Sequence, residues 1–175
     1  MRENGGQYTH AALWSAWAFL ELGRIEEGYE LFQLLNPILR ADSSEKAVHY
    51  RVEPYVVAAD VYGSPPYVGQ GGWTWYTGSS SWMYRLGLEG FLGLKKRGNW
   101  LEMDPRIPRS WPGFKVDYCF GAAPYLIIVK NPDGINRGIR QVTRDGNPLP
   151  NDFIPLVDDG KQHEVIVIMD SAGST

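Results

Sequence analysis

Cysteine is almost absent from the sequence, because Cys119 is the only one among 175 residues. One cysteine cannot form an internal disulfide, which excludes a fold stapled by such bridges. Since Cys119 lies in an apolar run, we expect it to be a buried and unreactive thiol. The three histidines, His10, His49 and His163, lack the spacing of metal ligands, so the sequence predicts no metal site.

Positive charge and long apolar runs are also scarce. The net charge is −3 and the pI is near 5.6, with Lys95–Arg97 as a single short basic run. This balance argues against a nucleic-acid partner, which needs a basic surface. The sequence has no signal peptide and no apolar span of about twenty residues, so we expect no membrane segment and a soluble, cytoplasmic chain.

Aromatic residues, by contrast, are plentiful, with seven tryptophans and ten tyrosines. The stretch Gly69–Gly87 combines three of the tryptophans with five glycines and a Thr-Gly-Ser-Ser-Ser run. Flat rings are common platforms in carbohydrate sites, although large rings also pack in ordinary cores. Hydrophobic residues make up 43% of the chain, which is enough for a buried core.

The first half of the chain carries apolar residues at helical spacing. Thr9 is the expected N-cap of the first helix, Gly23 makes a tight turn between two antiparallel helices, and Pro37 kinks or shortens the second. We expect helices over His10–Leu22, Ile25–Leu39, Glu53–Tyr62 and Ser79–Leu92, and loops over Ala41–Tyr50 and Gly63–Thr77. Residues 1–93 are therefore predicted to form one helical domain.

The second half alternates short β-rich runs with turn signals. We expect antiparallel strands over Phe114–Phe120, Tyr125–Val129, Ile139–Arg144 and His163–Met169. Residues 94–175 then form an antiparallel β-region, a partial sandwich. Neither half makes a convincing core alone, so we expect the C-terminal part of a larger α+β multidomain protein.

Two stretches carry candidate binding chemistry. In the first, a Gly-Gly turn lies between Glu3 and His10, at the start of a helix whose N-terminus favours anions. The plain alternative is a loop that ends in a capped helix. In the second, Thr77 and Gly78 precede a helix whose amide groups suit phosphate. Here the alternative is that Ser79 or Ser80 caps the helix while the neighbouring rings pack as core.

Carboxylates do not form an evident hydrolytic pair, which would need an acid and a base across a sugar ring. Several carboxylates have the spacing of a solvated helical face, namely Glu21, Glu26, Glu27 and Glu30. Others read as turn formers, namely Asp145, Asp158 and Asp159. Glu3, Glu53 and Asp60 lie in unusual contexts, but none has a convincing partner in the sequence.

Three ordered motifs nevertheless resemble one family. The runs ENGGQYTHAALWSAWAFLELGR, EPYVVAADVYG and GQGGWTWYTGSSSWMYRLGLEGFLGL are similar to the C-terminal part of the inverting disaccharide phosphorylases of glycoside hydrolase family 94. The segment NGGQYTHAALW resembles more closely the corresponding segment of cyclic β-1,2-glucan synthases and β-1,2-oligoglucan phosphorylases. The resemblance implies the end of an (α/α)6 barrel made of helical hairpins. It also implies phosphorolysis, with inorganic phosphate as co-substrate, no cofactor, and a β-glucan oligosaccharide as the other partner.

The resemblance also assigns roles to individual residues. It implies phosphate binding by His10, Thr77 and Gly78. It implies sugar binding by Arg2, Glu3, Gln70, Trp73, Trp75 and Tyr76. It implies no catalytic residue in this chain, because the family's general-acid aspartate lies upstream of the position matched by Arg2.

Departures from the family pattern refine this expectation. The cellobiose enzymes have an amide where this chain continues as Ala58-Ala59-Asp60, which favours a different linkage such as β-1,2. Without the acid, we expect no turnover by the chain alone, whereas a full-length synthase would be associated with the inner membrane. Two alternatives remain open: a non-catalytic carbohydrate-binding module, and a structural remnant of a truncated gene that associates with itself or with the missing barrel portion.

Overall fold

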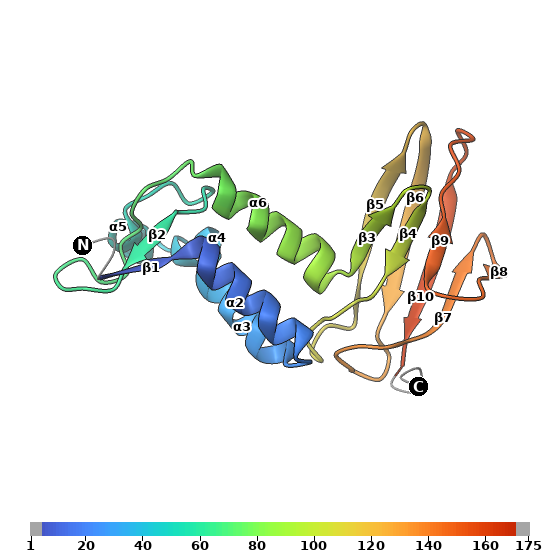
Figure 1. The fold of residues 1–175 in the computed structure, drawn as a ribbon, viewed down its shortest axis with the longest axis horizontal. Helices are drawn as coiled ribbons and strands as arrows, with labels where there is room; N and C mark the ends of the chain where they lie inside the picture. Colours follow the sequence, from blue (N-terminus) through green and yellow to red (C-terminus); the bar gives the residue numbers. More distant parts are fainter. Residues whose placement is uncertain (1–4, 171–175) are drawn as a thin grey trace. The chain divides into compact units, whose positions relative to one another are not determined.

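The computed structural model describes residues 5–170, which fall into two compact units, Met1–Gly87 and Leu88–Thr175. The described part of the first unit contains five α-helices and a two-stranded sheet (Figure 1). The second contains a five-stranded and a three-stranded sheet. Helices thus occur together with antiparallel and mixed sheets.

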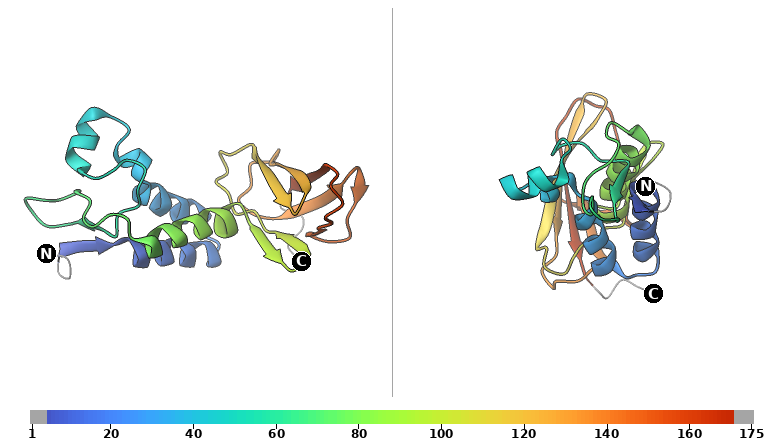
Figure 2. Two further views of the ribbon diagram at one scale, coloured as in Figure 1. Left: turned by 90° about the horizontal axis from the view of Figure 1, so that it is seen from above. Right: turned by 90° about the vertical axis from the view of Figure 1, so that its left-hand side faces the viewer.

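The helices of the first unit are α2 (Thr9–Glu21), α3 (Ile25–Leu35), α4 (Pro37–Arg40), α5 (Ser44–Tyr50) and α6 (Thr77–Arg85). The predicted hairpin of α2 and α3 is confirmed, and Figure 2 shows α6 packed along it. Gly23 makes the turn at φ +74°, a conformation that glycine adopts without steric cost. Gly28 brings the helices together, because a Cβ atom there would lie 3.1 Å from the carbonyl oxygen of Ala16. The first N-cap differs from the prediction, since Tyr8 takes that position and Thr9 is the first helical residue.

The helix predicted over Ile25–Leu39 is divided at Asn36, and the segment that follows it is more helical than predicted. Pro37 begins the short helix α4, in keeping with its preference for a first helical position. Residues 41–50 are not a loop throughout, because α5 occupies Ser44–Tyr50. The side chain of Ser43 accepts a hydrogen bond from the Lys46 amide at 3.3 Å and caps this helix. The predicted loop was therefore wrong over α5.

The helix predicted over Glu53–Tyr62 is also wrong. Its end forms β2 (Asp60–Tyr62), which pairs antiparallel with β1 (Gly6–Tyr8). Pairing with a strand some fifty residues earlier in the chain overrides the weak local helix preference. β2 leads the chain back to the start of α2, where the Thr9 amide donates to the carbonyl oxygen of Ala59 at 2.9 Å.

The helix predicted over Ser79–Leu92 is present with altered bounds. It begins two residues earlier, at Thr77, and beyond Arg85 it widens into the π-helical segment η1 (Leu86–Phe91). Thr77 and Gly78 are therefore in the first turn of α6 rather than in the preceding loop.

The strands of the second unit are β3 (Leu94–Arg97), β4 (Trp100–Met103), β5 (Gly113–Phe120), β6 (Ala123–Lys130), β7 (Ile139–Arg144), β8 (Asn147–Pro148), β9 (Phe153–Pro155) and β10 (His163–Met169). One sheet has the order β5-β6-β10-β7-β8, and the other has the order β3-β4-β9. The expectation of a wholly antiparallel region is wrong, because β10 runs parallel to β6, with Val165 opposite Ile127. The chain passes through β9 before β10, and this crossover lets β10 enter between β6 and β7.

The core of the second unit is one continuous apolar cluster. Its fully buried members include Leu101, Ile107, Ile127, Val165 and Met169. Cys119 is not among them: it is an exposed free thiol, so the prediction of a buried thiol is wrong. β5 is an edge strand that pairs only with β6, and alternation along it turns the Cys119 side chain outward.

Candidate functional site

Two helix N-termini from distant parts of the sequence lie close together in the first unit. α2 and α6 begin near each other (Figure 1), and His10 is in the first turn of α2 while Gly78 is in the first turn of α6. A Cβ atom placed on Gly78 would lie 3.9 Å from Nδ1 of His10. The hydroxyls of Tyr8 and Tyr76, the two residues that precede these helices, are 3.2 Å apart. The fold thus brings His10, Thr77 and Gly78, the three predicted phosphate-binding residues, into one neighbourhood.

Neither helix start carries a side-chain cap. Tyr8 and Tyr76 occupy the N-cap positions and accept no hydrogen bond there. Ser80 does not cap α6, since its hydroxyl donates to the Thr77 carbonyl oxygen at 3.0 Å. The hydroxyl of Ser79 is buried with no hydrogen-bond partner among the described residues. Uncapped amides at the positive end of a helix dipole are suited to an anion.

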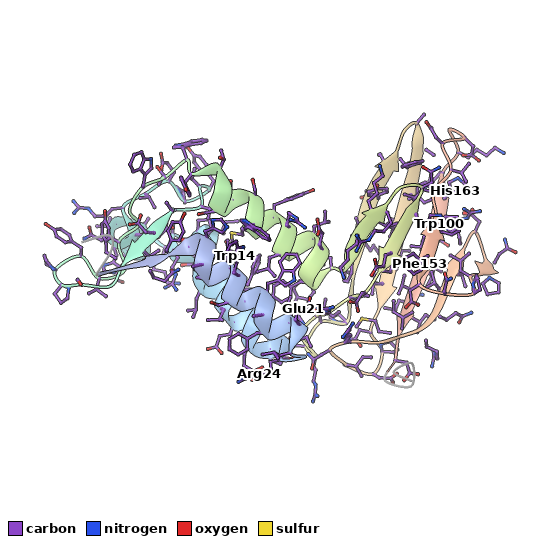
Figure 3. The ribbon with its side chains drawn as sticks, viewed as in Figure 1. Trp14, Glu21, Arg24, Trp100, Phe153 and His163 are labelled. Carbon is purple, nitrogen blue, oxygen red and sulfur yellow. The ribbon has the colours of Figure 1, made fainter. Side chains whose placement is uncertain are left out.

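The imidazole of His10 is held by aromatic rings. The ring centroid of Trp14 lies 4.7 Å away in an edge-to-face arrangement, and that of Trp82 lies 5.7 Å away. Trp14, labelled on α2 in Figure 3, also meets Trp82 edge to face at 5.5 Å, which links α2 to α6. Nε2 of His10 is buried and has no hydrogen-bond partner within residues 5–170. The rings therefore hold the imidazole and help to bury an Nε2 atom that lacks a hydrogen-bond partner among these residues.

A small pocket of about 170 Å³ opens beside Thr77. It is lined by Tyr55, Val56, Val57, Trp75, Tyr76, Thr77 and Ser80, a set without a charged side chain. Three of the predicted residues, Trp75, Tyr76 and Thr77, therefore share one pocket. Sequence reasoning missed Tyr55 and Ser80, although Tyr55 belongs to the EPYVV motif.

The other predicted sugar-binding residues are less closely gathered. Trp73 is 65% exposed, and Gln70 is half-buried, but neither lines this pocket. The backbone of Gln70 is fixed by hydrogen bonds with Tyr62 and Tyr67. Arg2 and Glu3 lie outside the described residues.

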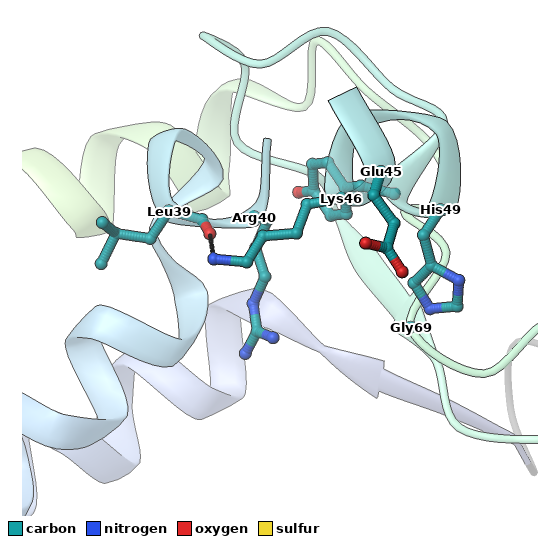
Figure 4. Close-up of a pocket in the computed structure, with 7 residues that line it drawn as sticks. Leu39, Arg40, Glu45, Lys46, His49 and Gly69 are labelled. Atoms are coloured by element: carbon teal, nitrogen blue, oxygen red, sulfur yellow. Dashed lines mark hydrogen bonds between the residues drawn. The ribbon is translucent and has the colours of Figure 1, made fainter. Parts of the chain in front are cut away.

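Two further pockets lie elsewhere in the first unit. One, of about 310 Å³, is lined by Leu39, Arg40, Glu45, Lys46, His49, Tyr50 and Gly69 (Figure 4). Both of its long cationic side chains already have partners. Lys46 pairs with Asp42 at 2.8 Å, and Nε of Arg40 donates to the Leu34 carbonyl oxygen at 2.7 Å. The other, of about 440 Å³, shares Arg40 and Gly69 with it and is mainly apolar. Neither contains a residue with a predicted role.

The turn-forming aspartates of the second unit have a role that the sequence did not reveal. His163 contacts Asp145 through Nδ1 at 2.7 Å and Asp159 through Nε2 at 3.1 Å. The hydrogen bond with Asp145 raises the pKa of His163 against the opposing effect of burial, and Asp159 adds to the rise. These contacts tie two loops to the start of β10.

Metal and membrane features are not found in the described part of the chain. Over residues 5–170, no group of three or more histidine, cysteine or carboxylate side chains is arranged to hold a metal ion. Over the same residues, no helix has the length and apolar character needed to cross a bilayer.

Comparison with protein families identifies the class to which this chain belongs. The family model "Glycosyl hydrolase 94 superfamily, catalytic domain" matches residues 1–93, more than half of the chain. The chain therefore belongs to the glycosyl hydrolase 94 superfamily, and the resemblance drawn from the three motifs is confirmed.

The chain is also similar to individual proteins. The chain is 56% identical over 129 residues to the cyclic β-(1,2)-glucan synthase NdvB of Rhizobium meliloti, an alignment that covers 74% of this chain. It is 32% identical over 170 residues, 97% of its length, to the N,N'-diacetylchitobiose phosphorylase of Vibrio proteolyticus. The solabiose phosphorylase of Paenibacillus borealis is 27% identical over 168 residues, or 95% of the chain.

The relatives are much longer than the aligned region. The alignments cover 5% of the synthase, 21% of the chitobiose phosphorylase and 22% of the solabiose phosphorylase. The chain thus spans about a fifth of the phosphorylases that it matches and a smaller part of the synthase.

Proposed function

We propose that this chain forms the phosphate-binding side of an inverting β-glucan phosphorylase-like site, at the end of an (α/α)6 barrel. Residues 1–93 would supply the last barrel helices, and residues 94–175 the β-region that follows them. The substrate class is β-1,2-linked glucan, with phosphate as co-substrate and glucose 1-phosphate as the phosphorylated product.

The meeting of His10 with the start of α6 is the observation that carries this proposal. Nδ1 of His10 lies beside Gly78, so the imidazole comes close to Thr77 and to the first-turn amides of α6 from a position nearly seventy residues away. Each is a hydrogen-bond donor suited to an oxyanion, and such bonds to a charged group are stronger than neutral ones. A histidine that served only as core packing would not need a helix N-terminus opposite it.

The glucan linkage is supported by the relatives. The synthase with 56% identity is named for β-(1,2)-glucan, whereas the phosphorylases of lower identity are named for other saccharides. The segment Ala58-Ala59-Asp60, which replaces the amide of the cellobiose enzymes, agrees with that choice.

The chemistry follows from these donors. Phosphate attacks the anomeric carbon from the face opposite the leaving sugar, the glycosidic carbon–oxygen bond breaks with inversion, and glucose 1-phosphate forms. His10, Thr77 and Gly78 would orient the phosphate and spread its charge. The departing oxygen needs a proton from a general acid, a role that no residue of this chain is assigned. We therefore expect binding without turnover by this 175-residue chain.

Isothermal titration of the chain with inorganic phosphate tests the proposal. We expect Thr77→Ala and His10→Ala to weaken phosphate binding about tenfold or more, as the loss of a charge-assisted hydrogen bond implies. Thr143→Ala, on β7, is the matched control and should bind as the wild type does. Equal binding by Thr77→Ala and the wild type, or no binding by the wild type, would overturn the phosphate site. Release of glucose 1-phosphate from phosphate and a β-1,2-linked glucose trimer would refute the expectation of no turnover.

A non-catalytic carbohydrate-binding module is the second candidate, and the strong exposure of Trp73 and Trp75 favours it. In that case glucan binding would survive Thr77→Ala and depend on the two rings, and phosphate would not bind.

A further inference from the structure

Trp75 has an unusual backbone for a large side chain. Its φ angle is +58°, in the left-handed region that non-glycine residues rarely occupy. Its side chain is nevertheless 69% exposed, so burial of the ring does not explain the conformation. A strained residue persists only where its surroundings fix it, and such residues often lie at binding sites.

Glu53 holds the indole of Trp75. Nε1 of Trp75 donates a hydrogen bond to Oε1 of Glu53 at 3.0 Å, across 22 residues of sequence. The pKa of Glu53 is lowered, first by a hydrogen bond from its own backbone and then by the bond from Trp75, with a smaller contribution from Thr74. Glu53 is itself fixed in a turn, because its carbonyl oxygen accepts from the Val56 amide at 3.2 Å. The carboxylate is thus a fixed acceptor for the edge of the indole.

Asp60 fixes the other end of the same loop. Its buried carboxylate accepts from the Trp73 amide at 3.1 Å, and its carbonyl oxygen accepts from the Gly72 amide at 2.8 Å. A Cβ atom on Gly72 would clash with this carboxylate, at 2.3 Å from Oδ1. The backbone is therefore anchored at Trp73, and the ring of Trp75, two residues further on, is tied to Glu53. Glu53 and Asp60, which have no evident partner in the sequence, therefore hold the same loop.

The held indole lines the small pocket beside Thr77. Tyr55 and Tyr76 stand in the same lining, together with the hydroxyls of Thr77 and Ser80. This lining has no charged side chain, so it can take an uncharged ligand without burying an unpaired charge. Exposed rings next to hydroxyl groups match a pyranose, which has apolar C–H faces and a polar rim.

We propose that Glu53 is a positioning residue, which orients Trp75 so that its exposed face stacks on an uncharged glucose ring bound next to Thr77. Trp75 contacts the sugar, whereas Glu53 acts through Trp75. This inference rests on the proposed function for the identity of the sugar. The hydrogen bond that it invokes is independent of any ligand.

The test combines substitutions at both ends of that hydrogen bond. Binding of a β-1,2-linked glucose trimer to the 175-residue chain is measured by isothermal titration. Trp75→Ala should weaken binding at least tenfold, because the stacking face is lost. Glu53→Ala should weaken it about threefold to tenfold, as the loss of one orienting hydrogen bond implies. Glu53→Gln should bind nearly as the wild type does, since its amide oxygen accepts from the indole.

A double-mutant cycle separates positioning from a general loss of structure. Trp75→Phe keeps an aromatic ring but removes the N–H donor. In the Trp75→Phe background, Glu53→Ala should then have no further effect on sugar affinity. Glu45→Gln, on exposed α5, is the matched control and should leave sugar binding unchanged. Independent effects of the two substitutions, or wild-type affinity in Glu53→Ala, would overturn the proposal.

A ligand-free readout keeps the inference testable if a variant unfolds or if the proposed function fails. The indole N–H signal of Trp75 in a nitrogen-15 spectrum, assigned by its loss in Trp75→Phe, should exchange with solvent faster in Glu53→Ala than in Glu53→Gln. Equal exchange in these variants, or no trimer binding by the wild type, would refute the inference. Absence of phosphate binding refutes the proposed function alone, because no variant in this series touches His10, Thr77 or Gly78.

Discussion

The two units of the chain differ in how they use their apolar residues. In the second, the large apolar side chains converge on one buried cluster, and among its described residues only Trp100, Phe153 and Val157 are large, apolar and exposed. The first unit leaves many such side chains in contact with solvent. They are Tyr8, Trp14, Leu22, Leu34, Ile38, Leu39, Val48, Tyr55, Tyr67, Val68, Trp73, Trp75, Tyr76 and Tyr84.

The second unit therefore buries most of its large apolar side chains in its own core, whereas the first unit exposes many of them on its surface. Exposed apolar patches on a protein mark places where something else binds. In the first unit the exposed rings of Trp75 and Tyr76 belong to the same pocket as Thr77. We therefore propose that the first unit binds the ligand and that the second serves as a scaffold.

The largest expected effect is in the core of the second unit. Ile127→Ala removes a fully buried side chain from the centre of β6 and should lower the free energy of unfolding by about 2–5 kcal/mol. Val48→Ala, at a 76% exposed position of α5, should change it by no more than about 0.5 kcal/mol. Urea unfolding followed by circular dichroism measures both. If the two substitutions cost the same, the exposed face of the first unit is covered in solution and the comparison fails.

The His163 cluster should make the stability of the second unit depend on pH. The pKa of His163 is raised in the folded chain, so its stabilisation is complete below the unfolded value of about 6.5 and is lost as the pH rises through the folded value. The pKa values of Asp145 and Asp159 are lowered, so their contribution is lost as the pH falls through the folded values, below about 3.9.

Thermal melting between pH 4.5 and 9 measures this effect. The wild type should lose about 1 kcal/mol or less on the alkaline side, because Asp145 is 40% exposed and solvent weakens the pair. His163→Gln should flatten that decline, while His49→Gln, at an exposed position of α5, should leave it unchanged. An identical decline in His163→Gln would show that the cluster does not support the scaffold.

The sequence predicted elements well where the signal was local. The α2–α3 hairpin follows from apolar spacing and Gly23, and the break at Pro37 follows from its missing amide hydrogen. It failed where distant pairing decides the structure. β2 forms because β1 is available to pair with it, and β10 lies parallel to β6 because of a crossover through the other sheet.

The candidate site shows the same division. Each helix start was recognisable as a potential anion site, but no local pattern predicts that His10 meets Gly78 across 68 positions; that expectation came from the family resemblance. Likewise, the sequence shows no partner for Glu53 or Asp60, because their hydrogen-bond donors come from a distant loop, namely the Trp75 indole and the Trp73 amide. The His163 cluster joins two turns that the sequence showed only as turns.

Gly78→Ala separates binding from stability in the first unit. A methyl group at this position would meet Cε1 of Tyr76 at 3.6 Å and Nδ1 of His10 at 3.9 Å, which are ordinary contacts. Replacing a helical glycine by alanine should therefore raise the free energy of unfolding by about 0.4–1 kcal/mol. The same methyl occupies the space between α6 and His10, so phosphate affinity should fall. A variant that is more stable and also binds phosphate as the wild type does would place the anion elsewhere.

The smallest expected effect concerns Cys119, the outward-facing thiol of the otherwise self-contained second unit. Cys119→Ser should change the free energy of unfolding by less than about 0.5 kcal/mol, because an exposed edge-strand position has little packing to lose. The folded wild type should react with one equivalent of a thiol reagent such as dithionitrobenzoate at a rate close to that of the urea-unfolded chain. A thiol that reacts only after unfolding would mean that the β5 edge is covered in solution. The second unit would then resemble the first in presenting a surface to a partner, and the contrast between scaffold and binding unit would be lost.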